Sequence, residues 1–287
     1  MAAKSISELF NVKDQVVVVT GGGGVLCGAM AECLGRNGVK VAVLDLRDDA
    51  AQTVAGQVTA AGGEAIAVAC NVLERDSLEA ARRTVLDAFG RIDTLINGAG
   101  GNNPKATCSM EWLTPERFAT PGEDTSFFDL DPSGVSFVFA LNFVGTLLPS
   151  QVFGEPMAAA GAGTIVNVSS MNAFTPLTKI AAYSAAKAAV SNFTQWLAVH
   201  LAPVGIRVNA LAPGFFLTDQ NRFLLVDKAT GQATARGQKI IDHTPMGRYG
   251  QPEELLGALL WLMSPAASFV TGTVVPIDGG FAAYSGV

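Results

Sequence analysis

The side chains best suited to acid–base chemistry are Tyr183 and Lys187, which lie four residues apart in the segment YSAAK. In a helix this spacing puts both side chains on one face. A phenol with a pKa of about 10 exchanges protons poorly at neutral pH, but a nearby ammonium group favours the phenolate. Ser170 closes a predicted strand upstream, so a loop can bring its hydroxyl beside the phenol, and Asn142 lies in an earlier helix. Together these residues predict a proton-transfer site.

A glycine-rich turn, TGGGGVLCG over residues 20–28, joins the first predicted strand to the first predicted helix. Glycines at such a turn let backbone N–H groups approach a diphosphate at the start of the helix. Asp45 ends the second predicted strand, 21 residues after Gly24. A carboxylate there accepts hydrogen bonds from the ribose hydroxyls of a dinucleotide and repels a 2′-phosphate. We therefore predict a dinucleotide cofactor and favour NAD over NADP, although Arg47 could instead bind the extra phosphate.

Two further strand ends carry candidate cofactor contacts. Residues 97–100 (NGAG) end the fourth predicted strand, and their small side chains leave room for a cofactor to lie across the strand ends. Asn71 ends the third predicted strand, where its amide or the following backbone can contact the adenine edge. Because the carboxyl ends of parallel strands share one edge of a sheet, these residues are expected to meet there.

Alternating apolar and amphipathic segments predict the elements that position these residues. Residues 15–20 (QVVVVT) form a β-branched run of the kind that is buried on both faces of a sheet. The predicted strands are 15–20, 39–45, 64–71, 94–97, 164–169, 207–211 and 273–277. The first predicted helix ends at about residue 37, and the others are 48–62, 75–89, 137–160, 181–202 and 252–263. This alternation predicts an α/β fold, a single-domain doubly wound parallel sheet (Rossmann fold) over residues 1–287 with helices on both faces.

Two segments interrupt the alternation. An irregular insertion at about 101–131 contains three prolines, and a polar, mixed stretch covers about 215–250. Both follow predicted strands, so both are expected to contribute loops to the edge of the sheet where substrate binds.

The composition excludes several classes of protein. Apolar residues make up 49% of the chain, which excludes intrinsic disorder, and a net charge of −6 lacks the basic surface that nucleic-acid binding requires. The longest nearly apolar stretch found in the sequence, 255–263, is about half a membrane-spanning helix, and the first ten residues contain no signal-peptide core. We therefore expect a cytoplasmic protein with no membrane partner. Four cysteines without CxxC spacing, and two histidines, predict reduced thiols and no metal site.

The chain resembles the short-chain dehydrogenase/reductase superfamily over about residues 10–287, through the ordered series TGGGG, Asp45, NGAG, Asn142, Ser170, Tyr183, Lys187 and APG. Longer segments are similar to the bacterial short-chain-type D-mannonate oxidoreductases, or fructuronate reductases: GGNNPKAT, LNFVGTLLPSQVF, APGFFLTDQNRFLL, HTPMGRYG and VPIDGGFAAYSGV. One departure concerns the glycine turn. Val25 and Cys27 stand where the superfamily pattern TGxxxGxG has glycines, so the turn is bulkier than usual.

The resemblance implies a role for each matching residue. Tyr183 is the general acid in ketone reduction and the base in alcohol oxidation, and Ser170 hydrogen-bonds the substrate carbonyl. Lys187 lowers the pKa of Tyr183 and binds the nicotinamide ribose, while Asn142 holds a water on a proton path to solvent. The implied cofactor contacts are Gly21, Gly23, Gly24, Val25, Leu26, Asp45, Leu46, Asn71, Val72, Asn97, Gly98, Ala99, Gly100, Tyr183, Lys187, Pro213, Gly214, Phe216 and Thr218.

The resemblance also implies a substrate class, a keto-sugar acid, with D-fructuronate and D-mannonate as the expected pair in an NAD-dependent reaction. The loop residues expected to contact this substrate are Asn102, Asn103, Lys105, Asn172 and Arg222, and the two cations are the expected partners of its carboxylate. Three alternatives stay open: another polyol or gluconate-type reductase, a 3-oxoacyl reductase, and a non-catalytic dinucleotide-binding redox sensor. Because superfamily members are usually tetramers or dimers, we expect a homotetramer or homodimer.

Overall fold

Seven parallel strands form one sheet at the centre of the computed structural model, which describes residues 4–119, 124–218, 222, 225–228 and 230–286. The strands are β1 (Val16–Thr20), β2 (Lys40–Asp45), β3 (Glu64–Ala69), β4 (Thr94–Asn97), β5 (Gly163–Val168), β6 (Ile206–Pro213) and β7 (Val274–Ile277). Their order across the sheet is β3-β2-β1-β4-β5-β6-β7. The order reverses between β1 and β4, and ligands of open parallel sheets bind in the crevice at such a reversal. The predicted doubly wound sheet is confirmed.

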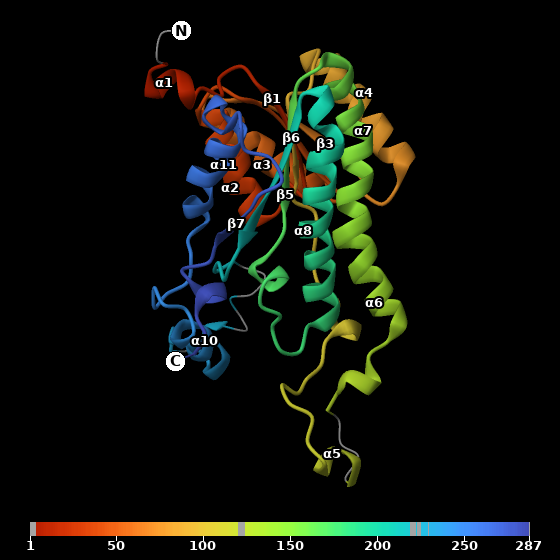
Figure 1. The fold of residues 1–287 in the computed structure, drawn as a ribbon, viewed down its shortest axis with the longest axis vertical. Helices are drawn as coiled ribbons and strands as arrows, with labels where there is room; N and C mark the ends of the chain where they lie inside the picture. The colour runs from red at the N-terminus through yellow and green to blue at the C-terminus, as the bar shows by residue number, and fades with distance from the viewer. Residues whose placement is uncertain (1–3, 120–123, 219–221, 223–224, 229, 287) are drawn as a thin grey trace.

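Helices cover both faces of the sheet, as Figure 1 shows. One face carries α2 (Val25–Arg36), α3 (Asp48–Ala60) and α11 (Leu256–Met263), and the other carries α4 (Arg75–Phe89), α7 (Gly145–Ala160) and α8 (Ala181–Leu201). Strand β1 shows why its sequence is apolar at every position. Val17 and Val19 pack toward α2 and α3, whereas Val16 and Val18 pack toward α4 and α7. Burial on both faces is the environment that the QVVVVT run predicts.

The helical run before β5 is longer and less regular than the predicted helix 137–160. It begins with α6 (Pro132–Phe139), continues through the π-helical turn η3 (Ala140–Val144) and ends with α7. Pro156 within α7 has no N–H to donate to the carbonyl of Val152. The Arg82 guanidinium of α4 donates to that carbonyl at 3.3 Å, so the backbone acceptor is satisfied from a neighbouring helix.

This run also corrects the expectation that 255–263 is the longest apolar stretch. By length and composition, the helical residues Pro132–Ala160 could cross a membrane, and 39% of the most apolar window is buried. Such a test is weak evidence by itself, because core helices of globular proteins pass it too. Here the run lies against β4, β5, α4 and α8.

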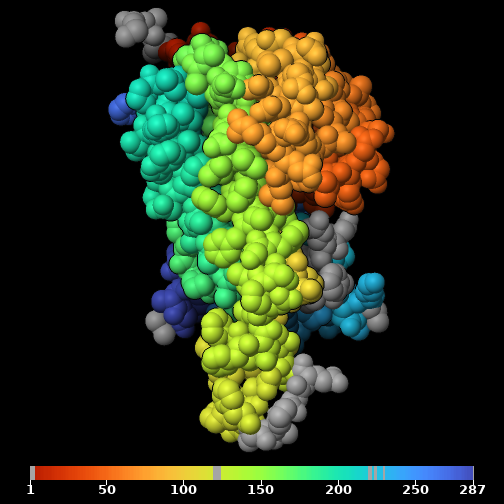
Figure 2. Space-filling view, turned by 90° about the vertical axis from the view of Figure 1, so that its right-hand side faces the viewer, coloured from red at the N-terminus to blue at the C-terminus, as the bar shows by residue number. Residues whose placement is uncertain are grey.

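The insertion at 101–131 projects from the body of the molecule as an arm, seen in yellow in Figures 1 and 2. It contains three short helical segments that the sequence did not predict, η1 (Pro104–Ala106), α5 (Glu116–Ala119) and η2 (Phe127–Asp129). At its neck the Asp131 N–H donates to the carbonyl of Lys105 at 3.0 Å, and further out the Ser109 N–H donates to the carbonyl of Thr125 at 2.9 Å. The arm is therefore folded back on itself. Its residues 120–123 lie outside the described part of the chain.

The stretch 215–250 contains a helix that was not predicted, α10 (Ala235–Asp242), and includes undescribed residues at 219–221, 223–224 and 229. Only Gly237 and Ile240 of α10 are buried, so its apolar periodicity is too short to recognise in the sequence. The predicted helix at 252–263 begins as a 3₁₀ turn, η6 (Pro252–Leu255). The other short elements are α1 (Ile6–Leu9), η4 (Met171–Ala173), η5 (Ala202–Val204), η7 (Pro265–Ala267) and η8 (Phe281–Ala283).

A chain of buried side-chain hydrogen bonds crosses the sheet beneath its carboxyl edge. Asn97 of β4 donates from Nδ2 to Ser150 Oγ of α7 and to Asn167 Oδ1 of β5, both at 2.9 Å. Asn167 Nδ2 donates in turn to Thr194 Oγ1 of α8 at 2.9 Å, and Ser150 Oγ donates to the carbonyl of Thr146 at 2.7 Å. These polar groups are at most 5% exposed. Water cannot reach them, so each group depends on a protein partner for its hydrogen bond.

We predict that Asn97→Ala lowers the free energy of unfolding by about 1–3 kcal/mol, because it leaves buried polar partners on α7 and β5 without their donor. Urea denaturation of the variant and the wild type measures this difference. Asn37→Ala is the matched control, since that exposed amide donates only to the carbonyl and thiol of Cys33. Equal losses in the two variants would contradict a structural role for the buried chain.

Candidate active site

A cleft of about 600 Å³ opens at the carboxyl edge of the sheet, and we call it the main cleft. Loops that follow β1, β2, β4, β5 and β6 line it together with the first turns of α2 and α8. Its lining residues are Gly21, Gly24, Val25, Leu26, Cys27, Asp45, Leu46, Arg47, Gly98, Ala99, Gly100, Gly101, Val168, Ser169, Ser170, Tyr183, Lys187, Pro213, Gly214, Phe215, Phe216 and Thr218. Most of the residues predicted to contact a cofactor are therefore brought together. Gly101, Val168 and Ser169 line the cleft without having been predicted.

The glycine turn presents bare backbone to the main cleft. Gly21 has φ +63°, a left-handed conformation, and a Cβ on it would lie 2.8 Å from Ala99 Cα in the neighbouring turn. Gly24 is the N-cap of α2 and supplies no side-chain acceptor to the first turn of that helix. The N–H groups of a first helical turn lack intrahelical acceptors and attract anions. The geometry suits the approach of a diphosphate.

Cys27 fits into the turn because a glycine lies opposite it. The Cys27 side chain is 6% exposed, and a Cβ on Gly98 would lie 2.2 Å from its Sγ. The thiol thus fills the space that the usual pattern leaves free at residue 27, and it fits because residue 98, just after β4, is a glycine. Burial raises the pKa of the Cys27 thiol to about 12, so it is protonated at neutral pH. Val25 differs, because it lies on the exposed side of α2 at 39% exposure.

Asp45 is held at the far end of the main cleft by backbone donors. Its Oδ2 accepts from the Gly23 N–H and its Oδ1 accepts from the Arg47 N–H, each at 3.0 Å. Gly23 itself does not appear among the lining residues, so its contribution in the described structure is to orient this carboxylate. Arg47 also lines the cleft. Asp45, the candidate ribose acceptor, and Arg47, the candidate partner of a 2′-phosphate, therefore lie in the same part of the cleft.

Ser170, Tyr183 and Lys187 also line the main cleft, and because Asp45 ends β2 while Ser170 follows β5, two strands, β1 and β4, lie between them. Tyr183 is the third residue of α8, and Ser170 is the N-cap of η4, where its Oγ accepts from the Asn172 N–H at 3.2 Å. Lys187 Nζ donates to the carbonyl of Val168 at 2.7 Å and lies 5.7 Å from the centroid of the Tyr183 ring. The helix spacing therefore places the ammonium beside the phenol, as predicted from YSAAK.

The pKa shifts differ from the expected lowering of the Tyr183 pKa by Lys187. Desolvation by burial raises the pKa of Tyr183, and a hydrogen bond with the Ser170 hydroxyl partly opposes the rise. Burial also lowers the pKa of Lys187, from 10.5 to about 8. Lys187 is only 4% exposed, and its Nζ donates to a neutral carbonyl, so little compensates for the loss of water. The Tyr183 hydroxyl therefore keeps its proton at neutral pH in this structure.

Asn142 lies in the π-helical turn η3 and is fully buried. Its Nδ2 donates to the carbonyls of Gly101 and Val138 at 2.7 and 2.8 Å, and its Oδ1 accepts from the Gly101 N–H at 3.2 Å. A Cβ on Gly100 would lie 2.7 Å from Asn142 Oδ1 and 3.1 Å from Lys187 Nζ, so both polar groups converge on that glycine. π-helical turns inside α-helices often mark functional sites. Sequence periodicity offers no signal for this turn.

Three other predicted cofactor residues have local roles in the described structure. Asn97 belongs to the buried hydrogen-bond chain and is 1% exposed. Asn71 donates to Glu74 Oε1 at 2.8 Å and accepts from the Leu73 N–H, at the turn before α4. Val72 is 7% exposed and packs in the core beneath the turn. None of the three side chains is among those that line the main cleft.

The residues predicted to contact substrate are dispersed. Asn102 donates to Thr107 Oγ1, and Asn103 caps η1 by accepting from the Lys105 N–H at 2.9 Å. Lys105 forms an ion pair with Asp131 at 3.3 Å. The two remaining residues are Asn172, whose buried Oδ1 has no partner among the described residues, and Arg222, which is exposed.

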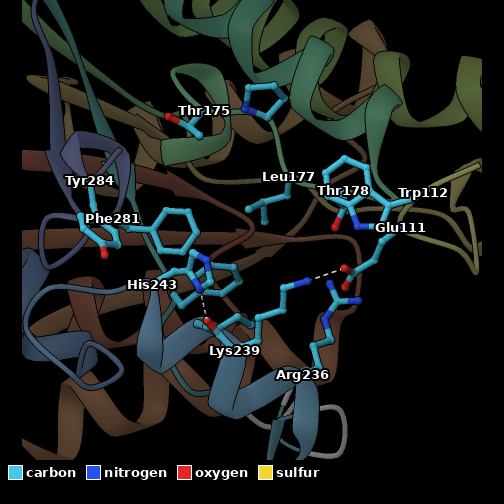
Figure 3. A pocket seen from close by; sticks show the side chains of 13 residues that line it. Glu111, Trp112, Thr175, Leu177, Thr178, Arg236, Lys239, His243, Phe281 and Tyr284 are labelled. Carbon is cyan, nitrogen blue, oxygen red and sulfur yellow. Dashed lines mark hydrogen bonds and ion pairs between the residues drawn. The ribbon is translucent and has the colours of Figure 1, made fainter. Parts of the chain in front are cut away.

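A second cavity, of about 280 Å³, lies beside the main cleft, and we call it the α10 cavity (Figure 3). Its lining residues are Glu111, Trp112, Thr175, Pro176, Leu177, Thr178, Phe215, Arg236, Lys239, Ile240, His243, Phe281 and Tyr284. The arm, the loop before α8, α10 and the C-terminal segment all contribute. Phe215 lines both cavities, so the two are adjacent. None of the α10 residues was predicted from the sequence to belong to the site.

Comparison with known proteins identifies the family. The family model described as enoyl-(acyl carrier protein) reductase matches residues 26–282. The uncharacterized oxidoreductase UxuB of Bacillus subtilis is 53% identical over 278 residues, which cover 96% of this chain and 98% of that protein. An uncharacterized oxidoreductase of Haemophilus influenzae is 51% identical, with 99% and 98% covered. This chain belongs to the short-chain dehydrogenase/reductase family.

One solved structure of the short-chain family is similar over nearly the whole fold. It is a crystal structure from Haemophilus influenza, proposed to be a D-mannonate oxidoreductase, with bound NAD. It is 51% identical to this chain, with a TM-score of 0.91 and coverage of 99% of this chain and 100% of the other. The family membership agrees with the resemblance of the motifs and makes the protein an oxidoreductase.

The lowered pKa of Lys187 predicts a pH dependence of stability. Between pH 8 and 10.5 the unfolded chain holds a proton on Lys187 that the folded chain has released, so the free energy of unfolding rises with pH through this window. Relative to Lys187→Met, wild-type stability should rise by up to about 1.4 kcal/mol per pH unit. Urea denaturation at several pH values measures this slope, with the exposed Lys13→Met as control. Parallel curves for wild type and Lys187→Met would contradict a destabilised ammonium.

Proposed function

We propose that this protein is an NAD(H)-dependent oxidoreductase of keto-sugar acids that interconverts D-fructuronate and D-mannonate. One observation carries the proposal. The main cleft has an acid–base group, Ser170 with Tyr183 and Lys187, at one end and an anchored carboxylate, Asp45, at the other. The NAD-bound relative proposed to act on D-mannonate supports the choice of substrate.

The residues present fit a dinucleotide. The backbone of Gly21 and Gly98 and the first turn of α2 line the main cleft, where a diphosphate would approach. Asp45 is oriented to accept from ribose hydroxyls, and its charge opposes a 2′-phosphate, which favours NAD over NADP. Asn71 and Val72 would reach the adenine only through the backbone of their turn. A nicotinamide cofactor, when bound, supplies or accepts the hydride.

The protein's own residues manage the proton in the proposed mechanism. In ketone reduction the Tyr183 hydroxyl donates its proton to the substrate oxygen as negative charge develops there, and in alcohol oxidation the phenolate takes that proton back. The Ser170 hydroxyl, hydrogen-bonded to Tyr183, donates to the same oxygen. Lys187 binds the ribose and attracts the phenolate electrostatically, and Asn142, clamped to Gly101, fixes η3 so that a water can connect Lys187 with solvent.

Two alternatives are less well supported. A 3-oxoacyl reductase requires a surface that docks an acidic carrier protein, whereas this chain has a net charge of −6. A non-catalytic redox sensor has no need for Ser170, Tyr183 and Lys187 together in one cleft. Gluconate-type and other polyol reductases share the same acid–base group, so only substrate measurements separate them from the proposed activity.

Exposed apolar side chains support assembly into a homodimer or homotetramer. Trp196 and Val199 of α8 are 58% and 78% exposed, and Phe137 and Phe139 of α6 are exposed at 44% and 37%. Large apolar side chains gathered on neighbouring helices are typical of protein–protein interfaces. We further infer a cytoplasmic location, which the four free cysteines support.

We predict that the protein oxidises NADH with D-fructuronate at a kcat/KM at least about ten-fold higher than with NADPH, because Asp45 disfavours the 2′-phosphate. Absorbance at the nicotinamide band measures both rates against a panel of keto-sugar acids, neutral ketoses and acyl thioesters. Activity confined to neutral sugars or thioesters would exclude the proposed substrate class.

Tyr183→Phe should reduce turnover by at least about two to four orders of magnitude, since it removes the donated proton and keeps the ring. Binding of NADH, followed by its fluorescence, should stay within a few-fold of wild type. Tyr249→Phe is the control, because that hydroxyl donates to the carbonyl of Gly237 away from the main cleft. Near wild-type turnover of Tyr183→Phe would overturn the mechanism.

A further inference from the structure

Positive charge is concentrated at one wall of the α10 cavity. Arg236 and Lys239 lie three residues apart on α10, and Figure 3 shows both side chains extending toward Glu111 of the arm. Lys239 forms an ion pair with Glu111. Lys179 and Arg236 also lie close enough to Glu111 to help lower the pKa of its carboxyl. Three cations thus surround one carboxylate, which leaves a local excess of two positive charges in a chain of net charge −6.

Two of these cations are available for a further anion. In the described part of the chain, neither Lys179 nor Arg236 has a carboxylate within ion-pair distance, whereas Lys239 is paired with Glu111 and Lys105 with Asp131. Clustered cations repel one another, so an arrangement with fewer anions than cations favours binding of an additional negative charge.

The backbone around Lys179 connects this charge cluster to the acid–base group. Lys179 lies four residues before Tyr183 and adopts φ +74°, an uncommon conformation for a residue with a side chain. Its carbonyl accepts from the Cys108 N–H at 2.8 Å, which ties the strained loop to the arm. Backbone strain that surrounding contacts maintain is found preferentially at ligand-binding and catalytic sites.

The remaining wall of the α10 cavity is largely apolar and aromatic, with two threonines among its lining residues. Phe215 and Phe281 pack edge to face with ring centroids 5.3 Å apart, and the Thr175 and Thr178 hydroxyls line the same space. Phe215 also lines the main cleft, so a molecule whose ketone reaches Tyr183 can extend past this ring toward the cations. In D-fructuronate the carboxylate and the ketone lie toward opposite ends of the carbon chain, which matches this separation of charge and acid–base group.

We propose that Arg236 and Lys239, assisted by Lys179, bind the substrate carboxylate in the α10 cavity, and that Glu111 competes with it for Lys239. This inference rests on the proposed function and assigns specificity for an acid to α10 instead of Lys105 or Arg222. Arginine pairs with a carboxylate through two parallel hydrogen bonds, so Arg236 is the stronger expected partner. Glu111 keeps the cluster partly neutralised and also joins the arm to α10.

Kinetics with D-fructuronate test the assignment. Arg236→Gln and Lys239→Gln should each raise KM about ten-fold or more with little change in kcat, because they remove binding that substrate and transition state share. Lys40→Gln is the matched control. It removes the same charge from a lysine that is ion-paired with Glu64 at 3.1 Å and lies at the amino end of β2, away from both cavities. With D-fructose, which lacks the carboxylate, any rate should be unchanged in all three variants.

Glu111→Gln separates a carboxylate site from a merely structural ion pair. It breaks the same ion pair as Lys239→Gln but leaves the cation without its competitor, so KM for D-fructuronate should fall instead of rise. If the pair only holds the arm against α10, the two variants should change KM in the same direction.

The outcomes distinguish this inference from the proposed function. Wild-type activity on D-fructuronate, with Arg236→Gln and Lys239→Gln no different from Lys40→Gln, would overturn the carboxylate site and leave the function intact. KM changes in the same direction for Glu111→Gln and Lys239→Gln would overturn it as well. Wild-type protein that reduces neutral ketoses but no keto acid would overturn both.

Discussion

The position of the acid–base group depends on satisfying polar atoms that lie under the carboxyl edge of the sheet. Asn97 and Asn167 stand side by side on β4 and β5, and their amides connect α7 to α8 through bonds that are shielded from water. A shift of either helix would leave a buried donor or acceptor unpaired, which is costly. Tyr183 and Lys187 extend from α8, and Asn142 lies on the helical run that includes α7, so the same constraint fixes all three relative to the sheet.

The sequence predicts most of what local periodicity determines. The boundaries of α4 and β4 agree with the predicted 75–89 and 94–97, and the YSAAK spacing correctly places Lys187 beside Tyr183. The π-helical turn η3 was not predictable, because it changes the hydrogen-bond register without changing the apolar pattern. Helix α10 was missed for a related reason, since it buries only one apolar side chain, Ile240.

Electrostatic partners were the least predictable part of the site, because they depend on which loops meet. In the sequence, Lys105 was a candidate partner for the substrate carboxylate. In the structure it pairs instead with Asp131, 26 residues later in the chain, at the neck of the arm. The pKa of Tyr183 illustrates the same limit. Spacing indicates a nearby ammonium, but the extent of burial is a tertiary property, and burial is the larger effect on both groups.

The folding of the arm onto itself has a consequence for how substrate preference could change over evolution or by design. Residues 109 and 125 are joined by a backbone hydrogen bond, so the excursion between them begins and ends at nearly the same place. Closing a longer or shorter excursion there costs little additional entropy. The excursion includes Glu111 and Trp112, which line the α10 cavity, but no residue of the acid–base group. The segment between residues 109 and 125 can therefore be exchanged, which would change one wall of the α10 cavity and leave the acid–base group unaltered.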